Sequence, residues 1–346
     1  MKKRLFCVLL GLLVGFSLPL SVFAIDDTVS TEPMDDALSL DDMLQVTTSI
    51  EDAFAVGYNV DTESITYYTL NTTALSSFDP EDFSSSSWFP EQLQRYNNNS
   101  NRAIVGDDNR VEVTNTRVFP YSAIAYMEMD FANGRDYTAT AFMISKNVAM
   151  TAAHNLFEKY SSGNDPVWAT TVKIWPGRNG DGIFSGRPFG RADAVEVVIS
   201  KQYYTESIGS ELSDYYDWGF IRLDDDIGEE CGYFGFELGA SYGSLVYVSG
   251  YGESDNKQRM GSGHTLDYSD FGFDPTYVRH YDVDVTDGQS GAPVYRETNG
   301  GEFLVIAVHN MDYADEPGGD YGSVNQGSCI THQLYAFILS YTAMWQ

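Results

Sequence analysis

Three short motifs occur in one order along this chain of 346 residues, and each contains a side chain suited to catalysis. T-A-A-H ends at His154, D-W-G-F-I begins at Asp217, and G-Q-S-G-A-P contains Ser290. A serine with Gly288 two residues before it and Gly291 directly after it can expose its hydroxyl while backbone N–H groups turn toward one point. This local geometry serves nucleophilic attack and stabilisation of an oxyanion together.

The order of the three side chains indicates the scaffold. His, then Asp, then Ser is the order of chymotrypsin-type enzymes, whereas subtilisins run Asp, His, Ser and α/β-hydrolases run Ser, acid, His. We therefore expect His154 to act as the general base, Asp217 to hold its other ring nitrogen, and Ser290 to be the nucleophile. The backbone N–H groups of Gly288 and Ser290 are expected to form the oxyanion hole. Together the motifs predict a serine endopeptidase that works through an acyl-enzyme.

No pattern in the sequence suggests a metal site. There is no C-x-x-C and no H-E-x-x-H, which are patterns typical of zinc proteins. The predicted mechanism requires no cofactor, so we expect neither a metal nor a cofactor.

The N-terminus has the features of a secretory signal. Residues 2–4 are K-K-R, an apolar stretch follows, and V-F-A ends at Ala24. A membrane anchor is the alternative, but the apolar stretch is short and is interrupted by Ser17 and Pro19. We expect cleavage after Ala24 and a secreted protein.

Residues 25–102 differ in composition from the rest of the chain. They contain fifteen acidic residues against Arg95 and Arg102, and no lysine. Such a segment resists packing on its own, so it is either a solvated linker or a propeptide that gains structure against the following domain. We favour a propeptide, with cleavage after Arg102 because exposed polar segments are preferred sites of nicking. The predicted organisation is a signal peptide (1–24), a propeptide (25–102) and a protease domain (103–346).

Charge and cysteine content limit the partners. The chain has 20 Lys+Arg and 50 Asp+Glu; without three basic residues of the leader and the two basic and fifteen acidic residues of the propeptide, 15 and 35 remain. This excess of negative charge disfavours nucleic acid and anionic membranes as partners. We expect a monomer that acts on proteins or peptides.

Cys231 and Cys329 remain after export into an oxidising compartment, so we expect them to form a disulfide.

The region 103–346 has the pattern of an all-β protein. Alternating residues predict strands over 122–127, 137–144, 195–199, 245–248, 281–285 and 303–308. Glycine-rich turns are predicted at 179–182 and 249–252. Only residues 332–344 have a helical pattern, with Leu334, Phe337, Ile338 and Tyr341 on one face. The predicted fold is a chymotrypsin-like double β-barrel with a C-terminal helix.

Seven further stretches are typical of one family. They are I-V-G-D-D at 104–108, V-T-N-T at 113–116, P-Y at 120–121, W-P-G-R-N-G at 175–180, I-G at 227–228, G-Y-F-G at 232–235 and V-S-G-Y at 248–251. With the three motifs, they make the chain resemble the secreted bacterial glutamyl endopeptidases, a chymotrypsin-fold family. The resemblance implies that His309, in A-V-H, contacts the carboxylate of the substrate residue before the scissile bond; otherwise it is a core histidine.

The chain departs from the family pattern at several positions, so we consider more than one preference for the substrate residue before the scissile bond. Val285 stands where the family commonly has a threonine donor, Asp287 stands where glycine is usual, and Asp312 soon follows His309. Asp284 occupies the place where trypsin-like enzymes keep the acid that binds Arg or Lys. Cleavage after Glu is our prediction, and cleavage after basic or other residues is the first alternative. The second is an inactive protease-like binding protein, against which the complete triad argues.

Overall fold

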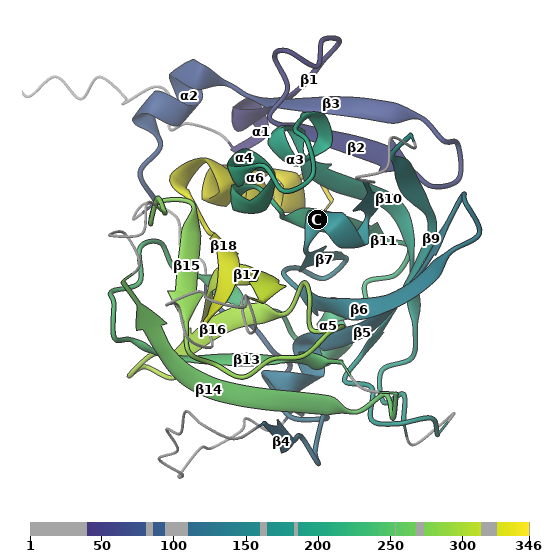
Figure 1. Ribbon diagram of the computed structural model, residues 1–346, viewed down its shortest axis with the longest axis vertical. Coiled ribbons are helices and arrows are strands. Elements are labelled where there is room, and N and C mark those ends of the chain that lie inside the picture. The colour runs from purple at the N-terminus through teal and green to yellow at the C-terminus, as the bar shows by residue number, and fades with distance from the viewer. Residues whose placement is uncertain are drawn as a thin grey trace, which may run out of the picture. The chain divides into compact units, whose positions relative to one another are not determined.

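The computed structural model describes residues 40–80, 86–93, 110–159, 165–182, 186–252, 254–267, 273–312 and 324–345. The predicted signal peptide and the predicted cleavage site after Arg102 lie outside these ranges. The described strands form two closed β-barrels, which confirms the predicted double barrel (Figure 1). No helix in the described ranges is long and apolar enough to cross a membrane.

The first barrel contains six antiparallel strands in the order β10-β11-β7-β6-β5-β9. They are β5 (Ile124–Phe131), β6 (Asp136–Met143), β7 (Val148–Thr151), β9 (Val167–Pro176), β10 (Ala192–Ser200) and β11 (Gly219–Leu223). The barrel closes because β10 also pairs with β9, at Ala192 and Asp193 only. The short strand β8 (Phe157–Glu158) pairs with β9.

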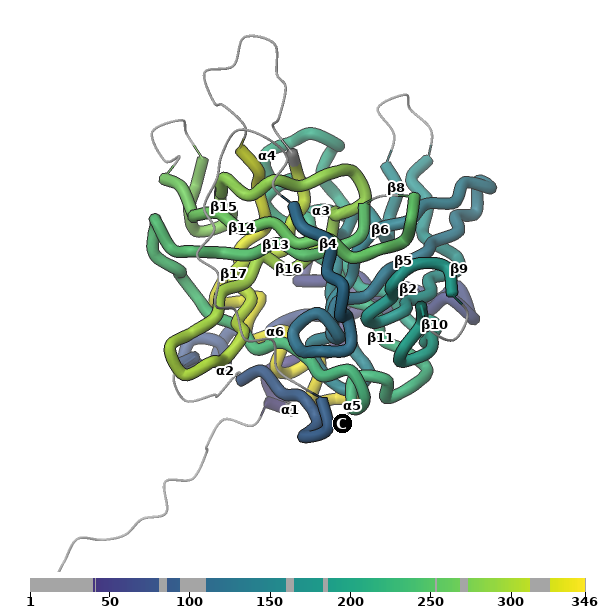
Figure 2. The backbone as a smooth tube through the Cα atoms, turned by 90° about the horizontal axis from the view of Figure 1, so that it is seen from below, coloured from purple at the N-terminus to yellow at the C-terminus, as the bar shows by residue number. Residues whose placement is uncertain are grey.

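The second barrel has the strand order β17-β16-β13-β14-β15-β18, and the pairing of β17 with β18 closes it. The six strands are β13 (Leu245–Tyr251), β14 (Gln258–Leu266), β15 (Val278–Tyr281), β16 (Pro293–Glu297), β17 (Phe303–Asp312) and β18 (Asn325–Cys329). Strands β4 (Val111–Glu112) and β12 (Gly235–Phe236) add to its outside. Figure 2 shows the second barrel and the first barrel side by side.

Part of the predicted propeptide continues the sheet of the first barrel. Strands β1 (Leu44–Thr47), β2 (Ala55–Asn59) and β3 (Ile65–Leu70) extend it in the order β1-β3-β2-β10, with two short helices, α1 (Leu40–Met43) and α2 (Thr72–Ser77). They are the purple and blue elements of Figure 1. Strand β2 pairs with β10 from Glu196 to Ser200, beyond the end that β9 covers. This acidic segment therefore packs against the domain that follows it.

The predicted C-terminal helix is confirmed as α6 (His332–Ala343), which begins after Thr331, whose side chain accepts a hydrogen bond from Leu334 N–H. All four residues of the predicted face are buried. The expectation of a single helix is wrong, because α3 (Lys201–Thr205), α4 (Glu211–Tyr215) and α5 (Gly228–Cys231) also form. Helices of four or five residues are too short to show a helical period in sequence.

Two local predictions need correction. The glycine-rich turn expected at 249–252 is largely strand, because β13 runs to Tyr251. Gly250 permits a close approach there, since a Cβ would lie 2.7 Å from Thr140 Oγ1. The strand expected at 281–285 ends at Tyr281. After it, the carbonyl of Val283 accepts a hydrogen bond from the side chain of Asn325 instead of from a neighbouring strand. The turn at 179–182 is confirmed, with Gly180 at φ +81°.

The predicted disulfide between Cys231 and Cys329 is wrong. Both are free, buried thiols. Cys231 ends α5 in the core that includes the first barrel, whereas Cys329 ends β18 of the second barrel. Burial raises the pKa of both thiols, to about 11 for Cys329. Burial therefore protects these thiols from the oxidation that motivated the prediction.

Candidate active site

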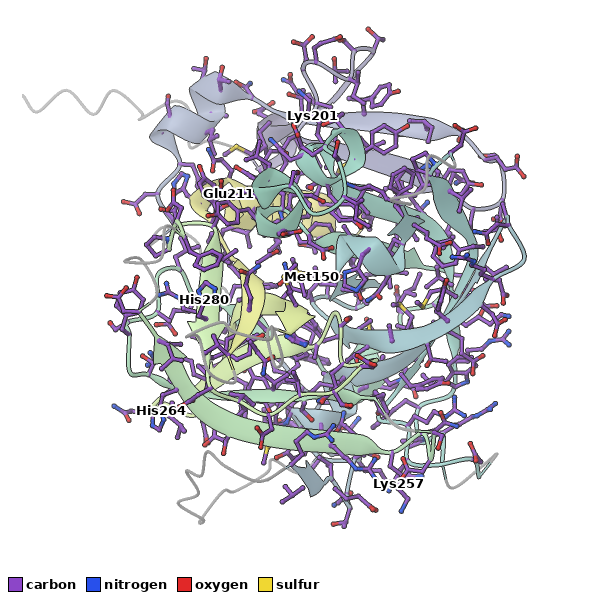
Figure 3. All side chains as sticks on the ribbon, in the orientation of Figure 1. Met150, Lys201, Glu211, Lys257, His264 and His280 are labelled. Atoms are coloured by element: carbon purple, nitrogen blue, oxygen red, sulfur yellow. The ribbon has the colours of Figure 1, made fainter. Side chains whose placement is uncertain are left out.

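The pairing of β7 with β11 brings the predicted base and acid together. His154 lies in a single 3-10 turn, Ala153–Asn155, just after β7, and Asp217 lies two residues before β11. Because Thr151 pairs with Gly219, the end of one strand meets the beginning of the other. One oxygen of Asp217 is 2.6 Å from His154 Nδ1, and the other accepts the His154 backbone N–H at 2.9 Å. Both the ring and the main chain of His154 are thus held by one carboxylate. Met150, which precedes Thr151 on β7, marks this region in Figure 3.

The environment of His154 makes its ring more basic. Burial by itself lowers the pKa of His154, but the charge of Asp217, its hydrogen bond and the charge of Asp214 outweigh burial, so the pKa is raised above its usual value. The side chain of His154 is still 33% exposed. The imidazole can therefore both receive a proton and meet a substrate.

Ser290 lies in the loop between β15 and β16, which packs on the His154 turn. Its carbonyl oxygen accepts hydrogen bonds from Thr140 N–H and from Asn155 Nδ2, both at 3.1 Å. Asn155 follows His154 directly, so this contact joins the two motifs. Among the described residues the Ser290 hydroxyl has no hydrogen-bond partner, which agrees with catalytic hydrogen bonds that often form only when substrate binds.

Two left-handed glycines shape the loop around Ser290. Gly291 has φ +85°, and a Cβ there would collide with Thr151 Oγ1 and the carbonyl of Thr140, so this backbone lies directly on the first barrel. Gly288 has φ +87°. Within the described ranges, the N–H groups of Gly288 and Ser290 donate to no other residue. They are therefore available to an oxyanion.

A charged cluster around Asp217 had no clear sequence signal. Burial and the charge of Asp217 raise the pKa of Asp214, on α4, to about 6. Burial lowers the pKa of Lys159 to about 8, and its ammonium donates to the carbonyl of Glu206 at 2.9 Å and to Ser213 Oγ at 3.1 Å. Asn155 was likewise not predicted to belong to the site, although it directly follows His154 in the sequence.

His309 lies on β17, next to the loop that carries Ser290. Its backbone carbonyl accepts from Gly291 N–H at 2.8 Å, and its N–H donates to the carbonyl of Ala292 at 2.9 Å. The side chain is buried, with Nδ1 2.7 Å from Tyr281 Oη and 3.2 Å from the carbonyl of Gln326. Burial lowers the pKa of His309 to about 4, so the ring is neutral near pH 7. No described residue forms a hydrogen bond with Nε2, which is therefore available to a ligand.

The other residues predicted to affect specificity differ in exposure. Val285 is half-buried and packs against the core of the second barrel. Asp284 is also half-buried, whereas Asp287 is exposed on the turn before Gly288. The side chain of Asp312 lies outside the described part of the structure. Across the described residues, no group of three or more His, Cys, Asp and Glu side chains could hold a metal ion.

Comparison with known proteins places the chain in a family. A family model described as "Trypsin-like peptidase domain" matches residues 139–306. The glutamyl endopeptidase of Bacillus licheniformis is 31% identical over 244 residues, which cover 68% of this chain and 67% of that protein. A Bacillus subtilis protein named "Extracellular metalloprotease" is 29% identical over 237 residues, 67% of each chain.

Two solved structures share the fold. A Glu endopeptidase in complex with MPD has a TM-score of 0.54 at 24% identity and aligns over 70% of this chain and all of its own. The protease Anisep from Arthrobacter nicotinovorans has a TM-score of 0.51 at 17% identity, over 67% of this chain and 99% of its own. With the sequence match to the Bacillus licheniformis enzyme, they confirm the resemblance seen in the motifs. The chain belongs to the bacterial glutamyl endopeptidase family of trypsin-like serine peptidases.

Proposed function

We propose that this protein is a secreted serine endopeptidase that cleaves after Glu through an acyl-enzyme. The observation that carries the chemistry is the double hydrogen bond between Asp217 and His154, beside the loop that holds Ser290. The observation that supports the specificity is His309, whose Nε2 is available next to that loop. One relative is named as extracellular, which supports secretion.

In the proposed mechanism, His154 takes the proton of Ser290 as its oxygen attacks the carbonyl carbon of the substrate. The N–H groups of Gly288 and Ser290 stabilise the oxyanion, and Asp217 stabilises the imidazolium. His154 then gives its proton to the leaving amine. A water molecule then loses a proton to the same imidazole and attacks the acyl carbon. The ester bond to Ser290 breaks, and His154 returns the proton to the Ser290 oxygen.

For recognition of Glu, the carboxylate of the substrate accepts a hydrogen bond from His309 Nε2–H. A neutral histidine carries its proton on Nε2 when Nδ1 accepts a hydrogen bond. In the structure Tyr281 Oη donates to the carbonyl of Gln326 at 2.9 Å, so we propose that in the substrate complex the hydroxyl turns its proton to His309 Nδ1, 2.7 Å away. Since Val285 supplies no hydroxyl, we expect weaker binding of Glu than is usual in the family.

We propose a signal peptide over residues 1–24, a propeptide over 25–102 and a catalytic domain over 103–346. Processing after Arg102 then starts the catalytic chain at Ala103. The protein acts as a monomer on proteins or peptides, and its net charge of −30 does not favour nucleic acid or anionic membranes.

A second specificity, for Arg or Lys, rests on two features. Asp284 lies six residues before Ser290 in the same loop and is half-buried. Val285 stands in place of a donor for glutamate. An inactive binding protein is disfavoured by the His154–Asp217 geometry, because a protein without activity has no need of an oriented base.

Cleavage-site profiling of the purified enzyme on a peptide library tests the proposal. We expect Glu before the scissile bond, and we expect His309→Ala to lower cleavage after Glu far more than it changes thermal stability. His280→Ala is a matched control, because His280 is a buried histidine on β15 of the same barrel with its pKa also lowered to about 4. A preference for Arg or Lys would instead assign the pocket to Asp284. Failure of a serine-directed phosphonate to label Ser290 would overturn the enzyme proposal itself.

A further inference from the structure

Among the described strands, one of the N-terminal segment covers most of one edge of strand β10 in the first barrel. On that edge of β10, strand β9 pairs with Ala192 and Asp193 alone, while β2 pairs with all five residues from Glu196 to Ser200. The backbone N–H of Val60 adds a hydrogen bond to the carbonyl of Val195. Without β2, this part of β10 would present unpaired backbone groups around Val197, Val198 and Ile199, and an exposed strand edge of this kind promotes aggregation.

The segment also supplies a partner to a buried charge. Glu196 is 5% exposed, and its two oxygens accept hydrogen bonds from Tyr68 Oη on β3 at 2.8 Å and from Tyr341 Oη on α6 at 2.7 Å. Burial, reinforced by the charge of Glu196, raises the pKa of both tyrosines, so both remain donors. Arg222 Nε lies 3.5 Å from one oxygen. A buried carboxylate that loses a donor is strongly disfavoured, so Tyr68 stabilises Glu196 as long as the segment keeps Glu196 buried.

A third contact reaches the neighbourhood of the catalytic acid. The ring of Phe54 packs against Trp218 at 5.5 Å and against Phe337 at 5.4 Å between ring centres. The carbonyl of Phe54 accepts the backbone N–H of Lys201, the residue labelled near the segment in Figure 3. Because Trp218 directly follows Asp217, the segment supports the chain that positions the acid.

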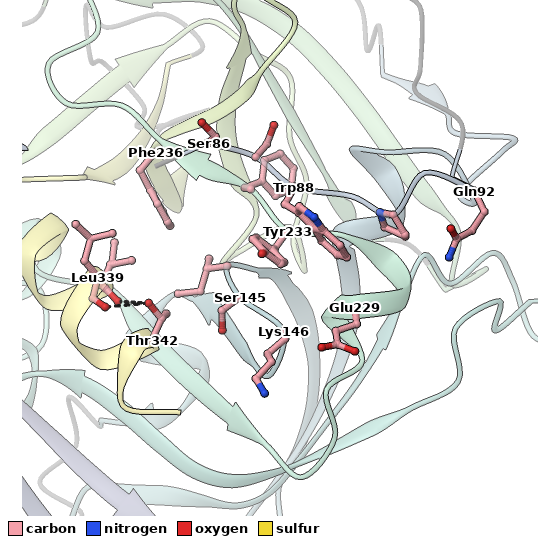
Figure 4. A pocket seen from close by; sticks show the side chains of 15 residues that line it. Ser86, Trp88, Gln92, Ser145, Lys146, Glu229, Tyr233, Phe236, Leu339 and Thr342 are labelled. Carbon is pink, nitrogen blue, oxygen red and sulfur yellow. Dashed lines mark hydrogen bonds between the residues drawn. The ribbon is translucent and has the colours of Figure 1, made fainter. Parts of the chain in front are cut away.

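Residues 86–93 contact the molecule a second time, away from the triad. Trp88 and Tyr233 exchange backbone hydrogen bonds of 2.9 and 2.8 Å, and their rings stack. Phe89 stacks on Phe119, and Ser87 donates to Glu302. A cavity of about 980 Å³, shown in Figure 4, is lined in part by α6 and by Ser86, Ser87, Trp88, Pro90 and Gln92, and none of the predicted site residues lines it.

The bound segment leaves the active site accessible. His154 keeps a third of its side-chain surface exposed, and within the described ranges no hydrogen bond joins residues 40–93 to His154, Asp217 or Ser290. We therefore propose that the N-terminal segment, described over residues 40–80 and 86–93, remains bound, after the chain is cut on its C-terminal side, as a non-covalent subunit that completes the first barrel of the active protease. This inference does not depend on which residue the enzyme cleaves after.

The first test compares the active protein under native and denaturing conditions. We expect one species by size-exclusion chromatography and native mass spectrometry that separates into two chains in denaturant, the larger beginning at Ala103. A fully active and stable catalytic chain without the segment would overturn the proposal. If the purified protein is a single uncut chain, we test a variant in which a recognition site for a specific protease replaces residues 97–101. This version carries Ser290→Ala, so that self-digestion cannot remove the segment. Co-elution after cutting supports the proposal, and separation in native buffer overturns it.

A pair of tyrosine variants identifies the contact responsible. In the cut protein, we expect Tyr68→Phe to speed dissociation of the segment about tenfold or more, because Glu196 then keeps an unsatisfied oxygen. Tyr67→Phe is the control: it lies on the same strand, and its hydroxyl has no hydrogen-bond partner among the described residues. We expect it to dissociate at the wild-type rate. Equal rates for the two variants would show that Glu196 does not hold the segment.

Discussion

The two barrels contribute to the same site but differ in how they are completed. The second barrel, which carries Ser290 and His309, closes with its own six strands. The first barrel, which carries His154 and Asp217, pairs β10 with β9 over only two residues and takes β2 along the rest of that edge. The proposed base and acid thus rest on an N-terminal segment, whereas the proposed nucleophile and His309 do not. A change in that segment should therefore affect one half of the site first.

The largest expected effect is a loss of catalytic activity without a loss of thermal stability. Ser290→Ala should lower kcat/KM by several orders of magnitude, as removal of a triad member does elsewhere. The thermal midpoint should stay close to that of the wild type, because the hydroxyl has no partner among the described residues. Turnover like that of the wild type in the purified variant would refute the assignment of the nucleophile.

The next effect tests the dependence of the first barrel on the segment. Phe54→Ala should destabilise the protein by about 2–4 kcal/mol, because an aromatic ring packed on Trp218 and Phe337 is lost. It should also lower kcat, since Trp218 adjoins Asp217. Urea denaturation and kinetics measure the two effects. Val46→Ala is the control within the segment, since Val46 is 65% exposed and should change stability little. Equal effects of the two variants would mean that the segment does not support the barrel.

A smaller effect concerns the pH dependence of kcat/KM, and we expect it from a charge next to His154 in the first barrel. The charge of Asp214 raises the pKa of His154, and catalysis needs the neutral ring. Asp214→Asn should lower that pKa, so the acid limb of kcat/KM should move to lower pH by a few tenths of a unit. Asp225→Asn, at an exposed acid of the same barrel, should leave the limb in place. A shift of the Asp214 variant toward higher pH would contradict the assignment.

The last prediction concerns how many cysteine thiols react in the folded and in the unfolded protein. We expect no rapid reaction of the folded, exported protein with a thiol reagent and two thiols after unfolding without reductant, because Cys231 and Cys329 are buried and unpaired. If no thiol reacts until reductant is added, a disulfide links the two barrels.

The sequence was sufficient for features that are local or periodic. His154, Asp217 and Ser290 each stand in a short motif, and the apolar face of α6 follows a helical period. It was insufficient where distant segments meet. Strand β2 pairs Ala55 with Ser200 across more than a hundred residues, and the acidic average over 25–102 hid the β-prone run I-T-Y-Y-T-L of β3. The contact of Tyr281 with His309 and the separation of the two cysteines likewise depend on folded distances that a residue count does not contain.

The bare backbone at Gly291 has a mechanical consequence. Because that position has no space for a Cβ between the nucleophile loop and the strands of the first barrel, the two barrels meet there main chain to main chain. A movement of one barrel against the other at this point would break the hydrogen bond from Thr140 N–H to the Ser290 carbonyl, unlike the hinges by which many two-lobed enzymes close over their substrates. The separation of nucleophile and base is then set by the backbone itself, and a single methyl group at residue 291 would act as a wedge that drives them apart.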